Sequence, residues 1–353
     1  MKIALLTIWH VKNYGAEMQA YATVKTLGAL GHDVTIIDFR LSDRCTVSLK
    51  QRIALAIINL TIAQYKFRKF WKRYFPKTTI RYRNLRELRD NPPQADMYLV
   101  GSDQVWNEEI TLEKAPAFFL DFGKDDIIRA SYASSIGTGV WGGSLELTEI
   151  AKKQLKKFKA VSCREKSGTE IIKKVFEIKA TTVLDPTLLH IDYSELTGVI
   201  KQQNTLVFYP LNRDDQMEEF CKDLSHELNM NFKNINNPSR ITRAITWNRL
   251  SVGEWLKSIA EASFVVTPSF HGLTFCLTFR KQFIIIKNSI NGNRHYRITD
   301  LLKELDLEDR FFDCIETAKN AKMWTKKIDY FRVEEKLSQL REESFNYITE
   351  LFQ

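Results

Sequence analysis

The stretch "VVTPSFHGLTFCLTFRKQFIII" (residues 265–286) holds two apolar runs joined by a helix-like segment. Apolar runs that alternate with longer amphipathic stretches are typical of parallel strands covered by helices. Ser269, His271 and Gly272 stand where the first run ends. A histidine that only packs in a core does not usually need a polar residue and a glycine beside it, so this joint is a candidate functional site.

The same alternation runs along the whole chain in two sets. Apolar runs lie at 2–8, 33–39, 97–102, 128–136, 160–164 and 181–185, and again at 205–211, 264–269 and 283–287. Two such sets predict an α/β fold with two Rossmann-like, doubly wound domains. We expect domains at 1–190 and 191–327. A C-terminal helix at 328–353 could pack back on the first domain, with Phe331, Leu337, Leu340, Phe345 and Ile348 as its buried stripe.

Composition indicates a globular protein from a reducing compartment. The 353 residues are 44% hydrophobic and 12% aromatic, which is enough to bury sizeable cores and excludes disorder. Five cysteines are scattered without a C-x-x-C pair, which favours reduced thiols over disulfides or a zinc site. No apolar run approaches 18 residues, and the N-terminus lacks the features of a signal peptide. We therefore expect a cytoplasmic protein without a metal.

The chain is basic, with 52 Lys and Arg against 43 Asp and Glu and a net charge of +9. Such a surplus suits anionic substrates, an anionic membrane surface or nucleic acid. Because no nucleic-acid-binding motif is visible, no nucleic-acid partner is expected.

Candidate site residues follow the apolar runs, because ligands of open α/β sheets bind beyond the carboxyl ends of the strands. "WHVKNYGAEMQAYA" (9–22) follows the first run, and its candidates are Asn13, Tyr14 and Gly15. Gly15 would allow a tight turn before a helix whose N-terminus could bind an anion. An ordinary strand–helix turn is an equally open interpretation.

The stretch "GSDQVWN" (101–107) gathers polar groups around Trp106 after another run. Such a density of polar and aromatic groups favours a binding site. Its candidates are Ser102, Asp103, Gln104 and Asn107. Asp103 could instead only cap a helix.

Two further joints add hydroxyl groups and an arginine. "SYASSIGTG" (131–139) contributes Ser134 and Ser135, and "SCREKSG" (162–168) contributes Arg164 beside Glu165. Arginine binds carboxylates and phosphates through paired hydrogen bonds. A surface salt bridge between Arg164 and Glu165 is the alternative.

His271 can give or take a proton near neutral pH, and its place at a strand end favours a functional role over core packing. After the last core run, "NSINGNRHYR" (288–297) brings Arg294, His295 and Arg297 together. This basic cluster suits an anionic group, although a solvated loop is also open.

In chain order, "NYGAEMQAYA", "GSDQVWN", "SYASSIG", "SCREKSG", "VLDPTLL" and "SFHG" resemble the polysaccharide pyruvyl transferase family. The similarity runs to about residue 310. It implies a GT-B-like fold with the active site in the cleft. It also implies transfer of a pyruvyl group from phosphoenolpyruvate, the donor substrate, to sugar hydroxyls of a cell-surface or capsular polysaccharide precursor, forming a ketal. No cofactor is expected.

The resemblance suggests roles for the candidates. We expect His271, Asp103 and Arg164 to be catalytic. We expect the substrate to be bound by Asn13, Tyr14, Gly15, Ser102, Gln104, Asn107, Ser134, Ser135, Ser269 and Arg294. Many family members carry Arg-Leu-His where this chain has Ser269, Phe270 and His271. The cation for the donor must therefore come from Arg164, Arg294 or another residue.

Two other functions remain open at this point. One is a GT-B-type glycosyltransferase that uses a nucleotide sugar, since a basic cleft, a histidine and a carboxylate would serve that reaction too. The other is a non-catalytic family member that only binds glycan.

The segment 49–77 joins an apolar stretch to a cluster of cations with aromatic residues between them. Its cations are Lys66, Arg68, Lys69, Lys72 and Arg73, and its aromatic residues are Phe67, Phe70, Trp71, Tyr74 and Phe75. One interpretation is a pair of helices packed on the first domain. The other is peripheral contact with the inner face of an anionic membrane, with aromatics at the interface, which would suit a lipid-linked acceptor.

Overall fold

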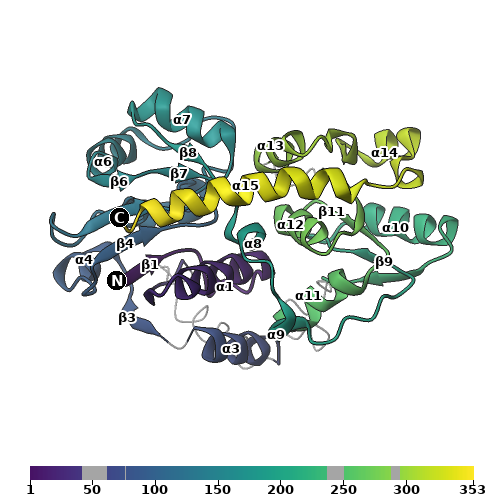
Figure 1. Cartoon of the computed structure of the whole chain (residues 1–353), viewed down its shortest axis with the longest axis horizontal. Coiled ribbons are helices and arrows are strands. Elements are labelled where there is room, and N and C mark those ends of the chain that lie inside the picture. The colour runs from purple at the N-terminus through teal and green to yellow at the C-terminus, as the bar shows by residue number, and fades with distance from the viewer. Residues whose placement is uncertain (42–61, 76, 237–249, 288–294) are drawn as a thin grey trace, which may run out of the picture.

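The computed structural model describes residues 1–41, 62–75, 77–236, 250–287 and 295–353. Two parallel sheets lie side by side, each with helices on its faces, and one long helix crosses both halves (Figure 1). The two doubly wound sheets agree with the predicted fold.

The N-terminal sheet has the strand order β3-β2-β1-β4-β5-β6, and every neighbouring pair is parallel. Its strands are β1 (Lys2–Leu6), β2 (Asp33–Phe39), β3 (Thr78–Tyr82), β4 (Met97–Val100), β5 (Ile128–Ser131) and β6 (Phe158–Ala160). Its main helices are α1 (Tyr14–Ala29), α3 (Ile62–Tyr74), α4 (Leu85–Asp90), α5 (Glu108–Thr111), α6 (Leu145–Leu155) and α7 (Lys166–Phe176).

Beyond β4 and β5 the ladder continues through single residues. Asp103 pairs with Ser134, and Ser134 pairs with Cys163 in β7 (Ser162–Cys163), which in turn pairs with β8 (Thr181–Thr182). This extension brings the joints at 101–107, 131–139 and 162–168 next to one another.

The C-terminal sheet has the order β10-β9-β11-β12-β13, again all parallel. Its strands are β9 (Thr205–Phe208), β10 (Asn231–Asn234), β11 (Phe264–Thr267), β12 (Gln282–Ile286) and β13 (Phe311–Phe312). Its helices include α10 (Asp215–Glu227), α11 (Val252–Glu261), α12 (Phe270–Thr278), α13 (Tyr296–Glu304) and α14 (Ile315–Ala321). The predicted boundary at residue 190 falls between α8 (Pro186–Leu189) and α9 (Ser194–Thr197).

Side chains of successive strand residues enter different cores, because they point to opposite faces of a sheet. In β1, Ile3 and Leu5 belong to one core, whereas Ala4 and Leu6 belong to another. The core around Ile3 also contains Val265 of β11. The two sheets therefore share one continuous hydrophobic core.

Helix α15 (Tyr330–Glu350) binds to both halves (Figure 1). Tyr330 donates a hydrogen bond to the carbonyl of Cys276 in α12, and Tyr347 donates one to the carbonyl of Ser131 in β5 (2.9 Å). The predicted stripe is right for Leu337 and Ile348, which are buried. It is wrong for Phe331, which is 83% exposed, and for Phe345, which is 38% exposed. The helix instead turns Val333, Ser344 and Tyr347 inward, so that Ser344 and Tyr347 bond to the N-terminal half.

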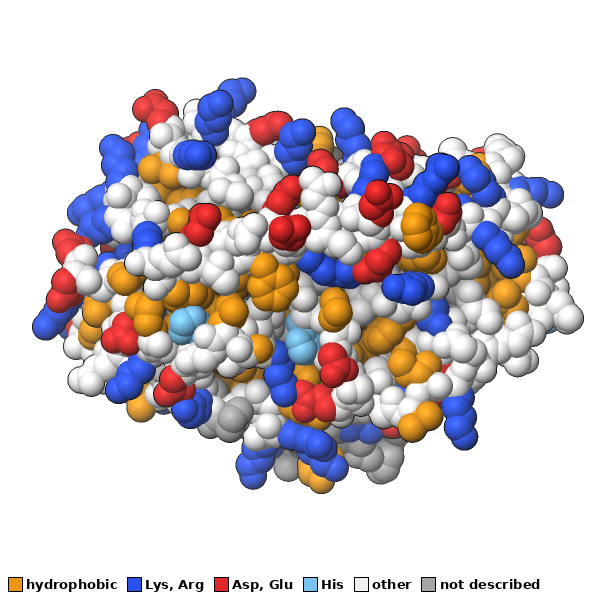
Figure 2. Space-filling view, viewed as in Figure 1, with side chains coloured by type: hydrophobic (Ala, Val, Ile, Leu, Met, Phe, Trp, Pro, Cys, Tyr) orange, Lys and Arg blue, Asp and Glu red, His pale blue; other side chains and the backbone are white. Residues whose placement is uncertain are grey.

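The aromatic residues of α3 lie in the core, which contradicts their predicted place at a membrane interface. Phe67, Phe70, Trp71 and, just after the helix, Phe75 are each at most 6% exposed. The exposed face of α3 is basic, with Arg68, Lys69, Lys72 and Arg73, and Lys and Arg side chains gather along this lower edge of the molecule (Figure 2). Residues 49–61 of the predicted segment lie outside the described residues. No helix in the described ranges is long and apolar enough to cross a membrane.

Candidate functional site

A cavity of about 250 Å³ lies between the two halves, at the carboxyl ends of β4 and β11. We call it the interdomain cavity. It is lined by Asn13, Asp103, Gln104, Ile110, Leu211, Asn212, Pro268, Ser269, Phe270, His271, His295 and Arg297. Five of the predicted site residues therefore meet in one place: Asn13, Asp103, Gln104, Ser269 and His271.

Two helices begin at this cavity, one from each half. Asn13 caps α1 by accepting hydrogen bonds from the amides of Gly15 (2.9 Å) and Ala16 (3.3 Å). Ser269 caps α12 by accepting one from the amide of Gly272 (3.2 Å). Because the first N–H groups of a helix have no partner within the helix, both ends give the cavity a positive potential. Such ends favour an anion.

Gly15 serves a different purpose from the predicted tight turn. It lies inside the first turn of α1 with ordinary helical backbone, and its φ is not positive. A Cβ atom built on Gly15 would lie 2.1 Å from Nδ1 of His271. The glycine is needed because the imidazole packs against the helix at this point.

The loop after β4 holds Asp103 in an uncommon backbone conformation. Gly101 has a φ of 116°, and a Cβ there would lie 2.1 Å from the carbonyl oxygen of Tyr132. Asp103 itself has a φ of 70°. Non-glycine residues with a positive φ are uncommon and tend to gather at functional sites. Asp103 is not a helix cap, since α5 is capped by Asn107.

Arg164 lies next to the cavity without lining it and forms ion pairs with three carboxylates. Its Nη1 is 2.8 Å from Oδ2 of Asp185, its Nη2 is 2.9 Å from Oδ1 of Asp103, and its Nε is 3.7 Å from Oε2 of Glu165. The side chain of Arg164 is fully buried. Arg164 does not line the interdomain cavity, so its contact with the donor stays a prediction, whereas the alternative of a surface salt bridge is wrong because the side chain is buried. Its position is suited to holding Asp103 and Asp185 in place.

The three predicted serines are also buried and bonded to protein groups. Ser102 donates to Oδ2 of Asp185 (2.9 Å), Ser134 donates to the carbonyl of Val100 (3.2 Å), and Ser135 donates to Oε1 of Glu165 (2.8 Å). None of the three lines the interdomain cavity as described. Their hydroxyls are bonded to two carboxylates and one backbone carbonyl, so contact of these serines with substrate stays a prediction that the cavity lining does not support.

Tyr14 and Asn107 do not line the cavity but contact residues next to it or in its wall. The ring of Tyr14 stacks on Trp255 at 5.0 Å, and its hydroxyl donates to the carbonyl of Leu250 (2.8 Å), so it joins the two halves. Asn107 donates to Oε1 of Gln104 (3.2 Å), which lines the cavity. Neither residue lines the cavity, so their direct contact with substrate stays a prediction.

His271 is nearly buried, with 8% of its side chain exposed. Its Nε2 lies 3.8 Å from Oδ2 of Asp185 and has no hydrogen-bond partner among the described residues. Burial lowers the pKa of His271 to about 4, although Asp185 and Asp103 act in the opposite direction. The imidazole is therefore neutral at pH 7 and can accept a proton.

Two carboxylates near it, those of Asp103 and Asp185, are charged at neutral pH. Burial alone would raise the pKa of Asp103, but Arg164, His271 and Arg297 lower it overall. The pKa of Asp185 is lowered in the same way, with burial opposed by His271, Arg164 and hydrogen bonds from Thr187. Burial raises the pKa of Glu165. The cavity thus pairs a neutral base with ionised carboxylates.

Three contributors to this site, Asp185, His295 and Arg297, were not among the predicted site residues. Asp185 follows the apolar run 181–185, and the Asp-Pro pair in "VLDPTLL" is the signal that could have marked it. Arg297 belongs to the predicted basic cluster, of which Arg294 was expected to bind substrate. Arg294 lies outside the described residues, and His295 and Arg297 both line the cavity. Across the described ranges, no group of three or more His, Cys, Asp or Glu side chains is arranged to hold a metal.

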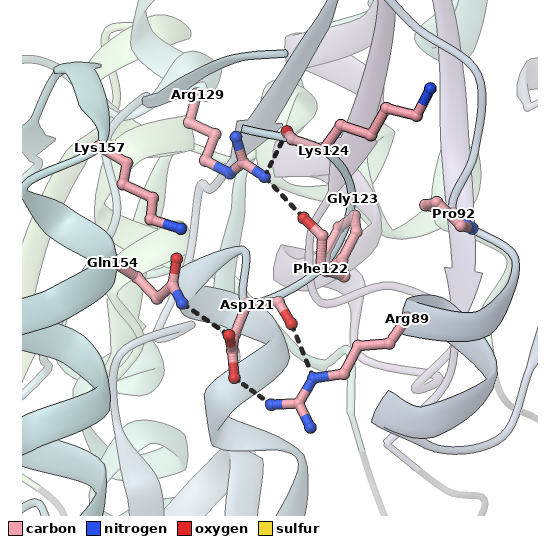
Figure 3. A pocket seen from close by; sticks show the side chains of 9 residues that line it. All are labelled: Arg89, Pro92, Asp121, Phe122, Gly123, Lys124, Arg129, Gln154 and Lys157. Carbon is pink, nitrogen blue, oxygen red and sulfur yellow. Dashed lines mark hydrogen bonds and ion pairs between the residues drawn. The ribbon is translucent and has the colours of Figure 1, made fainter. Parts of the chain in front are cut away.

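A second hollow, of about 480 Å³, lies at the amino ends of β4, β5 and β6. We call it the amino-end groove. It is lined by Arg89, Pro92, Asp121, Phe122, Gly123, Lys124, Arg129, Gln154 and Lys157 (Figure 3). Arg129 donates to the carbonyls of Phe122 (2.8 Å), Lys124 (2.9 Å) and Ile127 (3.0 Å), and Arg89 pairs with Asp121.

The family of the chain follows from a comparison of its sequence. The model of the polysaccharide pyruvyl transferase family matches residues 13–290, which is most of the chain and includes α1 with its cap Asn13 and the β11–α12 joint. The chain belongs to the polysaccharide pyruvyl transferase family. This membership supports a transferase of polysaccharide biosynthesis. No curated protein matches the chain significantly.

Solved structures with a similar fold include an epimerase. The structure of UDP-GlcNAc 2-epimerase from Methanocaldococcus jannaschii has a TM-score of 0.53 and 11% identity, covering 92% of this chain and 91% of that one. The same enzyme in complex with UDP-GlcNAc and UDP has a TM-score of 0.52 and 12% identity, covering 93% and 94%. At such identities the likeness concerns the fold alone. It confirms the predicted pair of Rossmann-like domains in a GT-B-like arrangement.

Proposed function

We propose that this family member transfers the pyruvyl group of phosphoenolpyruvate to two hydroxyls of a sugar in a polysaccharide precursor. The product is a pyruvate ketal, and phosphate is released. The observation that carries the proposal is the interdomain cavity, where a neutral histidine and an ionised aspartate lie between two helix N-termini.

The reaction defines what the site must supply. C2 of the donor forms two C–O bonds to the sugar, and its bond to the phosphate oxygen breaks. One hydroxyl proton moves to C3, which becomes a methyl group, and the other leaves with the phosphate. The protein must therefore bind an anion, accept a proton from a hydroxyl and deliver a proton to carbon.

His271 suits the proton steps. As a neutral imidazole it can accept the proton of the attacking hydroxyl. The imidazolium lies 3.8 Å from the carboxylate of Asp185, which stabilises it, and it passes the proton to C3 as C2 and the hydroxyl oxygen form their bond. Asp103, which also lines the cavity, is placed to orient the sugar or to share the proton transfer.

The N-termini of α1 and α12 suit the donor's phosphate and carboxylate. Asn13 and Ser269 cap these helices at the cavity wall, so the positive ends of both helix dipoles face the same space. Because the two helices come from different halves, one bound donor would contact both domains.

The test is incubation of the purified protein with phosphoenolpyruvate and a panel of lipid-linked and synthetic glycosides. Mass spectrometry should find the pyruvyl mass increment, with release of one phosphate per ketal formed. Calorimetric titration with a nucleoside diphosphate serves as the comparison. Tight nucleotide binding without any pyruvyl transfer would favour a glycosyltransferase, and binding of glycan without transfer from any donor would favour a non-catalytic member.

We also propose that the protein works in the cytoplasm on a lipid-linked acceptor, held at the inner face of the membrane by the basic face of α3. Arg68, Lys69, Lys72 and Arg73 are exposed there, and such residues are attracted to anionic headgroups. Co-sedimentation should require vesicles with anionic lipid and should decline when Lys69, Lys72 and Arg73 are replaced by Glu. Equal recovery in the supernatant with neutral and anionic vesicles would rule this contact out.

A further inference from the structure

Arg297 lines the interdomain cavity, and its guanidinium N–H groups make no hydrogen bond to the described residues. It lies in the first turn of α13, and only 12% of its side chain is exposed. Its ion pair with Asp103 has an Nη1–Oδ1 distance of 3.7 Å, which is too long for a hydrogen bond. Its Nε is buried and has no hydrogen-bond partner in the part of the chain that the structure describes.

Two other buried arginines make hydrogen bonds through their terminal nitrogens, although Nε of Arg164 also lacks a partner. Arg164 makes hydrogen bonds of 2.8 and 2.9 Å to Asp185 and Asp103. Arg129, in the amino-end groove, donates to several carbonyls of the surrounding loop (Figure 3). Burying a charge without such partners is costly. Of these three arginines, Arg297 is the one that faces a cavity and lacks them.

The surroundings of Arg297 favour an anion. Arg164 and Arg297 both lie over the ring of Phe270, at 4.6 and 5.6 Å from its centre. Burial and the charge of Arg164 lower the pKa of Arg297 to about 10, so it remains charged at neutral pH. Asp103 is shared between both guanidinium groups. A further anion in the cavity would relieve the repulsion between the two cations.

We propose that Arg297 binds the donor through paired hydrogen bonds to its carboxylate or phosphate group. This inference rests on the proposed function. It explains how the chain manages without an arginine at position 269, since the guanidinium enters the cavity from α13 instead. Asp103 holds Arg297 toward the helix N-termini at which the same anion would sit.

The experiment is calorimetric titration of the full-length protein with phosphoenolpyruvate, inorganic phosphate and pyruvate. Arg297→Lys keeps the positive charge beside Asp103 but loses the planar guanidinium group, which can donate two parallel hydrogen bonds to one anion. Its affinity for phosphoenolpyruvate should be about tenfold or more below that of the wild type. A selective loss of phosphate binding assigns the contact to the phosphate group, and a selective loss of pyruvate binding assigns it to the carboxylate.

Arg213→Ala is the matched control. Arg213 follows Asn212 in the cavity rim, but its side chain is 41% exposed and pairs with Asp215. Removing this charge should change the affinity for phosphoenolpyruvate by less than about twofold, because exposed charges are screened. A folded Arg297→Lys protein that binds phosphoenolpyruvate as tightly as the wild type would overturn the proposal.

The outcomes separate this inference from the proposed function. If the wild type neither binds phosphoenolpyruvate nor transfers pyruvate, the proposed function fails. If it does both and Arg297→Lys binds equally well, only the role of Arg297 fails. Should Arg297→Lys not fold, nuclear magnetic resonance of the wild type with ¹⁵N-labelled arginine replaces it. A buried Nε–H signal should then shift on addition of phosphoenolpyruvate, and the absence of any such shift would overturn the role.

Discussion

The interdomain cavity and the amino-end groove are both hollows lined by arginines, yet their charges are used differently. The groove is larger, at about 480 Å³ against 250 Å³. In the groove, Arg129 and Arg89 are bonded to loop carbonyls and to Asp121. In the cavity, Nε2 of His271 and Nε of Arg297 are buried without partners among the described residues.

The difference teaches that the state of the polar groups separates these two hollows better than their size does, although buried atoms without partners, such as Nε of Arg310, also occur elsewhere among the described residues. Bonded groups hold loops in place, whereas buried groups with unused capacity are available to a substrate. The position agrees with this interpretation. The cavity lies at the carboxyl ends of the strands, where ligands of open α/β sheets bind, and the groove lies at the amino ends.

The largest effect is expected from His271→Ala. If His271 moves the protons of the reaction, turnover should fall by about two to four orders of magnitude, the usual contribution of general acid–base catalysis. Phosphate release from phosphoenolpyruvate in the presence of a competent acceptor measures it. A folded variant with near-normal turnover would show that the interdomain cavity is not the active site.

The sequence could predict that the site lies at the carboxyl ends of the strands. It could not predict which side chains there face the cavity. Asn13, Asp103, Gln104, Ser269 and His271 were expected because they follow apolar runs, and all of them line the cavity. Arg164 and Ser135 follow apolar runs too, yet they point into the carboxylate network. Successive side chains at a strand end point to opposite faces of the sheet. Which of them faces the cavity depends on how the two halves pack together.

The fold was predictable where strands are buried on both faces. β4, β9 and β11 are fully buried and read as continuous apolar runs. β3, β10 and β13 were not predicted, and they are three of the four edge strands of the two sheets. β3 and β10 are half exposed and polar, and β13 has only two residues, so they carry no hydrophobic run to recognise.

The next largest effect concerns stability. Arg164→Met would leave Asp103 and Asp185 buried without their shared cation, which should lower the free energy of unfolding by about 3–5 kcal/mol. Arg89→Met in the groove removes an ion pair whose arginine is 52% exposed, and should cost about 1 kcal/mol or less. Urea denaturation of both variants makes the comparison. Equal urea midpoints would mean that the ion pairs of Arg164 contribute no more to the free energy of unfolding than the surface pair of Arg89.

A smaller effect on stability, but a clear one on activity, is expected from Gly15→Ala. The new methyl group would press on Nδ1 of His271 and should cost about 1–3 kcal/mol through overpacking. Gly28→Ala, in the same helix with no atom within 4 Å of its added Cβ, should instead stabilise by about 0.5–1 kcal/mol. Thermal unfolding and turnover are measured on both. Full activity in Gly15→Ala would show that the position of the imidazole is not restricted by α1.

The smallest effect is expected from the groove itself. Arg89→Ala with Lys157→Ala removes two of its cations, and in each of their ion pairs one partner is at least half exposed: Arg89 (52%) with Asp121, and Asp125 (78%) with Lys157. Exposed pairs of this kind contribute about 0–1 kcal/mol, and Arg129 would still hold the loop through its carbonyl bonds. Turnover and the affinity for phosphoenolpyruvate should therefore match the wild type within about twofold, because the groove lies at the opposite ends of the strands and such charges are screened. A clear loss of donor affinity in this double variant would mean that the groove binds the anion. The rule that unused buried polar groups mark the site would then fail for this protein.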